Sequence, residues 1–325
     1  MHLLAASAVD PWKWHAHPDV WAVFTTSLIL YWYAVTRIGP RVVRAGETIV
    51  TRRQVVWFCS GVAALWIVSD WPIHEIGEQY LYSVHMFQHL VMMLVVPPML
   101  LLGVPGWLTR WILRPPALAS AARALCRPVV AALIFNTTVA IQHWPALVNT
   151  VLEHHPLHFL AHLWLFSAAM IMWFPVLNKL PEFPRLGPAG KMIYLFIQSI
   201  IPNVPVAFLA FATGVVYKFY ATVPRPFGWN AVEDQQTAAA IMKVGGTFII
   251  WGIIVVVFFR WYNEWDRGST ADSQQRRRSE MAASAAAVRG RVPATGPATA
   301  TADAALTWAD VERELAASPP ASGNT

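Results

Sequence analysis

The sequence predicts an all-α, polytopic membrane protein, and its composition and apolar runs carry that prediction. The chain has 325 residues, of which 56% are hydrophobic and 13% are charged, whereas about one quarter of a soluble domain is charged. Several apolar runs approach the roughly 20 residues that a helix needs to cross a bilayer. Lipid cannot hydrogen-bond the backbone, so only helices or closed barrels span it, and runs of this length predict helices.

The apolar runs predict seven transmembrane helices in chain order. We expect them at about Val20–Thr36, Val55–Ser69, Leu81–Leu102, Val129–Ile141, Leu157–Leu177, Met192–Ala212 and Thr237–Phe259. Trp12, Trp14 and Trp21 lie at the start of the first run, as is typical of a membrane interface. Pro202 and Pro205 predict a break in the sixth helix, either as a binding feature or as a packed kink.

The loops between these runs alternate between basic and basic-poor. The first loop holds Arg37, Arg41 and Arg44, whereas the second, from Asp70 to Gln79, has no Lys or Arg. The positive-inside rule then predicts an external N-terminus and a cytoplasmic C-terminus. The expected domains are an extracytoplasmic segment (1–19), a seven-helix membrane domain (20–260) and a cytoplasmic, largely disordered tail (261–325).

Composition argues against several other classes of function. The net charge of +6 does not favour nucleic acid, because the basic residues lie in particular loops and in the tail. Cys59 and Cys126 are isolated, so thiol redox chemistry, a thiolate metal site and covalent haem attachment are unsupported. The start lacks a basic region followed by a long apolar core, so we expect no cleaved signal peptide.

The tail has its own composition. From Gly268 it is rich in Ala, Pro, Ser, Thr and Arg, which predicts disorder because little apolar surface is available for a core. The stretch Ala305–Ala316 is an exception that is expected to form a short, solvated helix.

Two pairs of histidines are the most unusual feature of the predicted spans. His85 and His89 are four residues apart, so a helix places both imidazoles on one face, and His158 and His162 repeat the spacing. A single histidine at such a depth commonly bonds a neighbouring carbonyl. Ionisable groups in spans are costly and usually face the protein interior. Because the predicted topology brings both pairs to the same depth on the outer side, we interpret them as one metal site.

The residue types favour a transition metal. Neutral imidazole suits Cu, Zn, Fe or Ni, and thioether sulfur favours Cu(I). The predicted ligands are His85, His89, His158 and His162, with His143 at the outer end of the fourth span and sulfur from Met86, Met92, Met93 or Met242 nearby. Methionine is also a common gap filler in cores. The residues expected to orient or line the site are Gln88, Asp234, Gln235 and Asn136, although Asn136 could instead bond across helices. Lys243 is expected to point away from the histidines.

Several short stretches, taken in order, resemble the multi-pass CtaG family of bacterial caa3-type cytochrome c oxidase assembly factors. They are His85–His89 with Pro97-Pro98 and Leu101–Pro105, Phe135-Asn136 with His143–Pro145, His158–His162 with Trp173–Pro175, and Asp234–Gln236 with Ile241-Met242. The resemblance covers about Val20 to Arg260 and implies a seven-helix membrane protein that handles copper for the oxidase. It implies a functional set of His85, His89, His143, His158, His162, Asp234 and Met242. The sequence departs from the family pattern at Ala239, where glycine is usual, and at Lys243, where an aromatic residue is usual.

The resulting hypothesis is a non-catalytic assembly factor of the bacterial plasma membrane. It would hold copper, as Cu(I) or Cu(II), on its extracytoplasmic side and deliver it to a haem-copper oxidase subunit. We expect the bilayer and the oxidase as partners, no nucleic acid, and a possible homo-oligomer. Three alternatives remain: a bis-His haem protein, an intramembrane zinc enzyme with Asp234 as base, which lacks a His-Glu-x-x-His pattern, and a metal transporter, suggested by the broken sixth helix.

Overall fold

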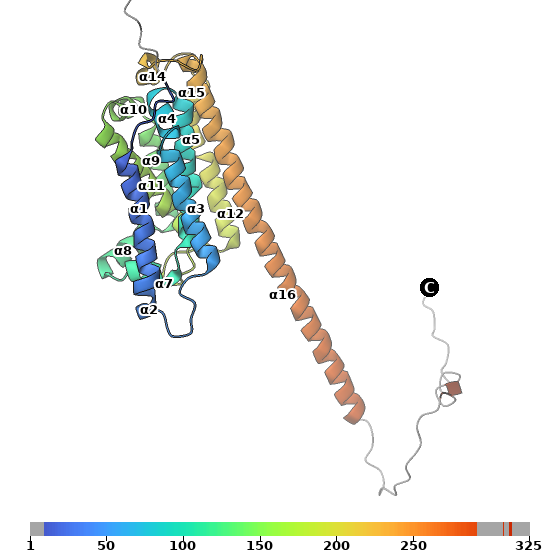
Figure 1. The fold of residues 1–325 in the computed structure, drawn as a ribbon. Helices are drawn as coiled ribbons and strands as arrows, with labels where there is room; N and C mark the ends of the chain where they lie inside the picture. Colours follow the sequence, from blue (N-terminus) through green and yellow to red (C-terminus); the bar gives the residue numbers. More distant parts are fainter. Residues whose placement is uncertain (1–9, 291–307, 309–311, 314–325) are drawn as a thin grey trace, which may run out of the picture. The chain divides into compact units, whose positions relative to one another are not determined.

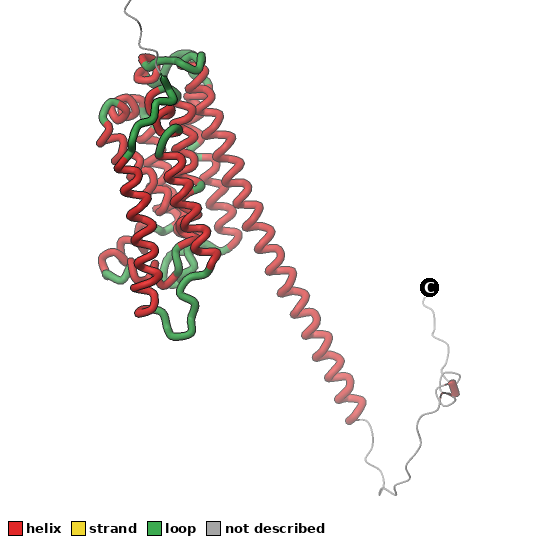
Figure 2. The backbone as a smooth tube through the Cα atoms, viewed as in Figure 1, coloured by secondary structure: helices red, strands yellow, loops and turns green. Residues whose placement is uncertain are grey.

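The structure of this chain, a computed structural model, describes residues 10–290, 308 and 312–313. Every regular element in this part of the chain is a helix, as the red segments of Figure 2 show. The chain divides into two compact units, Met1–Glu264 and Trp265–Thr325. The all-α prediction is therefore confirmed.

The first half of the first unit consists of short and medium helices. In chain order they are α1 (Pro18–Tyr33), the π-helical turn η1 (Ala34–Ile38), α2 (Gly39–Val42), α3 (Arg52–Ser69), α4 (Ile73–Gln79), α5 (Tyr82–Leu94), α6 (Val96–Gly103), α7 (Gly106–Ile112) and α8 (Pro116–Leu125). In Figure 1, α1 and α3 run alongside each other.

The second half contains the longest helices. They are α9 (Pro128–Gln142), α10 (Pro145–Leu152), α11 (His155–Leu177), α12 (Pro188–Ile200), α13 (Asn203–Ala210), α14 (Lys218–Thr222), α15 (Ala231–Ala240), the π-helical turn η2 (Ile241–Gly245) and α16 (Gly246–Gly290). The expected break in the sixth helix is confirmed, since α12 ends just before Pro202 and α13 begins just after it.

Three helices of the described residues are long and apolar enough to cross a membrane, namely Tyr82–Gly103, His155–Leu177 and Ala231–Ser284. The number rises to five if each of two bent pairs is one span: α3 with α4, bent by 41°, and α8 with α9, bent by 77°. The chain is thus a membrane protein with three to five candidate spans by length and composition.

The segment Asp70–Gln79, predicted as a loop, contains a further helix. Residues 73–79 form α4, which packs against the start of α5. Gly77 makes this close approach possible, because a Cβ there would lie 3.0 Å from the backbone nitrogen of His85. The hydroxyl of Tyr220 also donates to the Gly77 carbonyl at 2.8 Å. The loop prediction failed because short polar helices stabilised by tertiary contacts leave little apolar periodicity.

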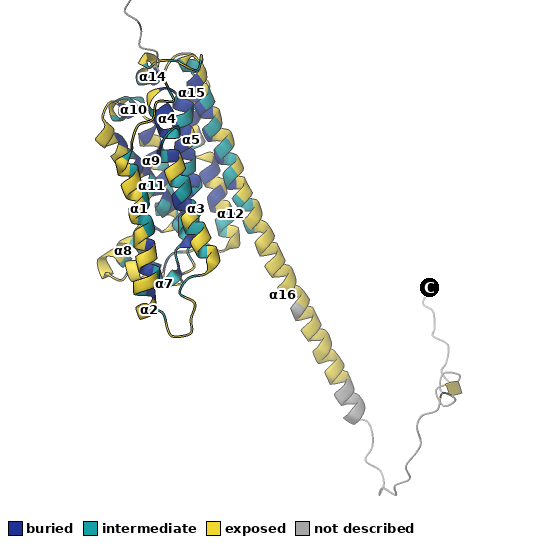
Figure 3. Ribbon diagram, viewed as in Figure 1, coloured by how far each residue is buried: buried dark blue, intermediate teal, exposed yellow. Residues whose placement is uncertain are grey.

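The core of the first unit lies between the faces of α5, α9, α11, α12 and α15 that point toward one another, drawn dark blue in Figure 3. Trp173 on α11 is fully buried and donates its indole N–H to the Met93 carbonyl at 2.9 Å. That carbonyl is one that α5 leaves unpaired near its end. The bond therefore ties together the two helices that carry the histidine pairs.

The structure of the second unit differs from the disorder predicted for the C-terminal tail. Helix α16 continues to Gly290, so the expectation of disorder is wrong for residues 268–290, where alanine and arginine are strong helix formers. Of the stretch Ala305–Ala316, only Trp308, Glu312 and Arg313 belong to the described residues, and they are helical. The rest of that stretch and residues 1–9, on which the signal-peptide expectation rests, lie outside the described residues.

Candidate metal centre

The four histidines of the two pairs meet in one buried cluster, as predicted. His85 and His89 come from α5, and His158 and His162 come from α11. Between the helices, the ring centroids are 5.2 Å apart for His85 and His158 and 4.9 Å apart for His89 and His162. None of the four residues is more than 9% exposed. We refer to these residues as the four-histidine cluster.

The ring nitrogens of this cluster are arranged as metal ligands would be. One nitrogen each of His85, His158 and His162 lies within 4.8 Å of the others. The Nε2 atoms of His89 and His162 are 2.9 Å apart, so one proton, or a cation in its place, must separate their lone pairs. Within the described part of the chain, His85 Nδ1, His89 Nδ1 and His158 Nε2 are buried without a hydrogen-bond partner. Unpaired buried nitrogens are costly, and a bound transition metal would satisfy them.

A small cavity lies beside this cluster and touches all four imidazoles. Its volume is about 20 Å³, and its wall also includes Met86 and Tyr82. A cavity needs about 10–15 Å³ to hold one water molecule. The space beside the cluster therefore suits a single small ligand.

Glu78 on α4 connects the cluster to a fifth histidine. Its carboxylate accepts from His158 Nδ1 at 2.7 Å and lies 3.2 Å from His74 Nε2. A bond at Nδ1 leaves Nε2 of His158 as the free nitrogen, which is how carboxylates commonly orient metal-binding histidines. This role of Glu78 and of His74 was not predicted from the sequence. Their four-residue spacing in an acidic segment without Lys or Arg was the available signal.

Histidines and carboxylates alternate from His74 toward the N-terminal segment. The rings of His74 and His17 are 5.1 Å apart, and His17 lies 3.2 Å from Asp70 and 3.4 Å from Glu75. Glu75 in turn contacts His15, whose side chain is 46% exposed, at 2.9 Å. The cluster is thus connected to the surface by polar side chains.

His143 lies next to the cluster without joining its closest contacts. Its ring centroid is 6.5 Å from that of His89, and its Nδ1 donates to the Val139 carbonyl at 2.7 Å. Its Nε2 is buried and has no partner among the described residues. The hydroxyl of Tyr217 donates to the His143 carbonyl at 3.1 Å, and burial raises the pKa of Tyr217, so that this donor stays protonated. His143 therefore remains a candidate fifth ligand.

Comparison with known proteins places the chain that has this geometry in a family. The sequence model of the cytochrome c oxidase caa3 assembly factor family (Caa3_CtaG) matches residues 29–264. The chain belongs to this family. The match confirms the resemblance carried by the histidine motifs.

Curated relatives of this caa3 assembly factor family member carry no functional description. Uncharacterized proteins of Mycobacterium leprae and Mycobacterium bovis are each 24% identical to it, over 247 and 239 residues. The matches cover 68% and 67% of this chain but 36% and 35% of the relatives, so the chain spans about a third of their length. An uncharacterized protein of Mycobacterium tuberculosis matches over the same share as that of M. bovis. No solved structure matches the chain.

Asp234 has a different role in this family member from the one predicted. Instead of orienting a histidine, its carboxylate accepts from the backbone N–H groups of Tyr82 and Ser83 at 2.8 and 2.9 Å. It also accepts from Arg225 at 3.0 Å. These bonds cap the N-terminus of α5, where the residue at the cap, Leu81, offers no side-chain acceptor. Asp234 thus fixes the helix that presents His85 and His89.

Replacing Asp234 by alanine should destabilise the membrane domain rather than remove one metal ligand. The change leaves Arg225 without its buried partner and α5 without its cap, a loss of about 3–5 kcal/mol. We expect a thermal unfolding midpoint in detergent several degrees below that of the wild type. Glu153→Ala, which removes an exposed carboxylate, serves as the control and should leave the midpoint unchanged. Loss of metal at an unchanged midpoint would instead identify Asp234 as part of the metal site.

Of the remaining predicted site residues, Gln88 contacts a histidine linked to the cluster, whereas Gln235 and Asn136 bond elsewhere in the fold. The amide of Gln88 lies 3.2 Å from His74 Nδ1, and Gln235 accepts from the Val216 N–H at 2.8 Å. Asn136 donates to Gln198 at 2.6 Å, which is the bond across helices. Met242 and Met93 line a separate cavity, whose lining includes none of the four cluster histidines. Lys243 is exposed and lines a shallow groove along α13 on the surface, as expected.

Proposed function

We propose that this protein is a non-catalytic assembly factor that binds copper at the four-histidine cluster and delivers it to a haem-copper cytochrome c oxidase. The observation that carries the proposal is the convergence of four buried imidazoles with unpaired nitrogens on two packed helices. Membership of the caa3 assembly factor family supports the oxidase as the recipient. Copper is the cargo in this proposal, so the cluster must hold the ion and also release it.

The donor set favours copper over the other metals that imidazole binds. The cluster offers nitrogen donors, and thioethers lie close by: Met86 lines the small cavity and Met92 lines a larger one. Soft sulfur near imidazole favours Cu(I), whereas carboxylate oxygen suits harder ions. Glu78, the nearest carboxylate to the cluster in the described residues, bonds to the rings of two histidines and so acts on the ligands instead of on the ion.

A seven-span topology with an external N-terminus accompanies this proposal. The alternation of basic and basic-poor loops supports it. The acidic and histidine-rich segments around the cluster, including Asp70, Glu75 and His15, all fall in the part that this topology places outside. We propose that copper is received and released on the extracytoplasmic side of the plasma membrane.

The alternatives receive less support from the geometry. A haem needs a pocket of several hundred cubic ångströms, whereas the two cavities that touch the cluster measure about 20 and about 180 Å³. Asp234 bonds to a helix terminus and an arginine, which leaves it poorly suited as the base of a zinc enzyme. The break between α12 and α13 lies next to the bonded pair Asn136 and Gln198 and not at the histidines.

The test is the composition of the oxidase in cells that lack this gene. Complementation with wild type or with His154→Ala, an exposed histidine outside the cluster, should restore an active oxidase with normal copper. Complementation with the His89→Ala/His162→Ala double variant should give an oxidase that contains haem but lacks copper. Full oxidase maturation by the double variant would refute copper delivery by this cluster.

A further inference from the structure

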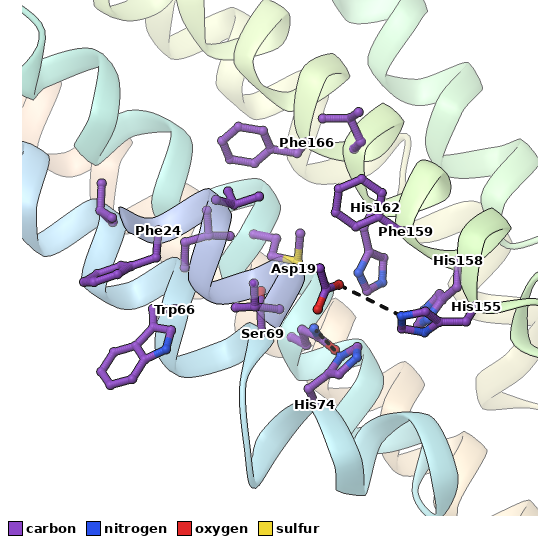
Figure 4. Close-up of a pocket in the computed structure, with 17 residues that line it drawn as sticks. Asp19, Phe24, Trp66, Ser69, His74, His155, His158, Phe159, His162 and Phe166 are labelled. Atoms are coloured by element: carbon purple, nitrogen blue, oxygen red, sulfur yellow. Dashed lines mark hydrogen bonds and ion pairs between the residues drawn. The ribbon is translucent and has the colours of Figure 1, made fainter. Parts of the chain in front are cut away.

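A second cavity, of about 180 Å³, is bordered by the histidines of α11, namely His155, His158 and His162. Side chains of α1, α3, α4, α5 and α11 line it, and Figure 4 shows His158 and His162 facing Phe24 and Trp66 across it. Most of its lining is apolar and includes Val23 and Phe166. His158 and His162 line both this cavity and the small one.

The larger cavity opens at the ends of two helices. Asp19 at the start of α1 and His155 at the start of α11 lie at its edge, 4.0 Å apart, as the dashed line in Figure 4 shows. Both residues, with Phe159, also line a shallow hollow of the surface. His158 and His162 line the same cavity, so a group that enters from this hollow can reach both rings.

The polarity of the cavity lining determines which chemical groups can enter. A hydrated cation would lose its water in this mostly apolar cavity, at a large cost, and the polar side chains that line it, such as Asp19, His74 and Gln88, offer few ligands in return. An apolar group is favoured there, since an engineered apolar cavity of about 150 Å³ holds benzene. Met92 places one thioether in the wall, and Gln88 is fully buried with its carbonyl oxygen unpartnered among the described residues. The cavity therefore fits an uncharged side chain better than a free ion.

We propose that this cavity is the port for copper exchange, and that it receives a methionine thioether of the protein that donates or accepts the ion. The inference rests on the proposed function and names the chemistry of its partner. A thioether is preferred to a thiolate because burial in apolar surroundings disfavours the charged thiolate, and Asp19 at the opening adds a negative charge. The partner is thus a protein segment with a protruding methionine.

The exchange is a ligand substitution that conserves charge and electrons. Copper remains Cu(I) throughout, and each Cu–S bond to the partner that breaks is replaced by a Cu–N bond to an imidazole. His158 already carries its proton on Nδ1, bonded to Glu78, and its Nε2 has no partner among the described residues. The proton between the Nε2 atoms of His89 and His162 moves to His89 Nδ1, which has no partner among the described residues, when copper binds, and it returns when copper leaves. The reverse substitution releases copper to a recipient methionine.

Filling the cavity tests the proposal. Val23→Trp on α1 places a bulky ring in the port, and Leu163→Trp fills it from α11. Ile29→Trp adds the same ring to an exposed position of α1 outside the port and is the matched control. The probes are a synthetic methionine-rich peptide loaded with Cu(I) and Cu(I) held by the hydrophilic chelator bicinchoninate, each mixed with the full-length protein in nanodiscs.

We expect either filled variant to slow transfer from the peptide by about tenfold or more, a barrier increase of at least about 1.4 kcal/mol. Its equilibrium Cu(I) affinity should stay within about twofold of wild type, and Ile29→Trp should match wild type in both. The chelator should transfer more slowly than the peptide to wild type.

Three results would refute the proposal that this cavity is the port for copper exchange. They are unchanged peptide transfer in both filled variants, a loss of affinity equal to the loss of rate, and chelator transfer as fast as that from the peptide. If the wild-type protein does not bind Cu(I) at equilibrium, the proposed function is refuted as well. If it binds Cu(I) normally and the filled variants accept copper from the peptide at the wild-type rate, only the proposed port is refuted.

Discussion

Replacing His162 by alanine should lower copper affinity by at least about 100-fold, more than the 10–100-fold typical of residues that only support a ligand. The reason is geometric: His162 Nε2 is 2.9 Å from His89 Nε2, and its ring also lies beside those of His85 and His158. His89→Ala should have a similar effect. The double variant should lose little more, because residues that share one site are not additive. Equilibrium competition with a Cu(I) chelator measures all three.

The control for these variants is His154→Ala, which removes an exposed imidazole bonded to the Thr150 carbonyl. It should bind copper as wild type does. All variants should remain folded, since an alanine in the cluster removes a buried polar group from lipid, although it leaves a neighbouring ring unpaired. Wild-type copper affinity in both single variants would mean that the two histidine pairs are structural.

The second large effect is expected from Glu78→Gln. The carboxylate holds the proton of His158 on Nδ1, which leaves Nε2 free, and it also reaches His74. An amide keeps the shape but has lost the charge and can turn a donor toward the ring. Loss of such a partner commonly weakens metal binding by about 10–100-fold, and the same competition assay should detect it.

Glu75→Gln is the matched control for Glu78→Gln. Glu75 is on the same short helix, but its contacts are His15 and His17 and not the cluster. Its replacement should change copper affinity by no more than about threefold, or about 0.7 kcal/mol. Equal losses in both variants would indicate a general effect of acidic charge in this segment and would remove the specific role of Glu78.

The histidine cluster could be predicted from sequence because its information is local. The spacing of four residues determines that His85 and His89 share a helical face, whatever the rest of the fold does. The same holds for His158 and His162, and the cost of polar groups in lipid then requires that both pairs face the interior. The break at Pro202 was predictable for a similar reason, because proline cannot continue the backbone pattern of a helix.

Tertiary contacts, in contrast, were not visible in the sequence. Glu78 lies 80 residues from His158, and Asp234 caps a helix 152 residues away. Nothing in the local pattern distinguishes such carboxylates from solvated ones. Met242, predicted as a nearby sulfur donor and also implied by the resemblance, lines another cavity together with Met93. Helix α16 extends further along the chain than predicted. Composition alone does not exclude a helix in an alanine-rich segment.

Copper binding at the four-histidine cluster is tested most directly by copper X-ray absorption on the untagged protein, loaded with one equivalent of Cu(I). We predict scattering from nitrogen neighbours with the multiple-scattering pattern of imidazole, and its loss in the His89→Ala/His162→Ala variant. His154→Ala should give the wild-type spectrum. A spectrum without imidazole scattering, or one that the double variant leaves unchanged, would contradict copper binding at the four-histidine cluster.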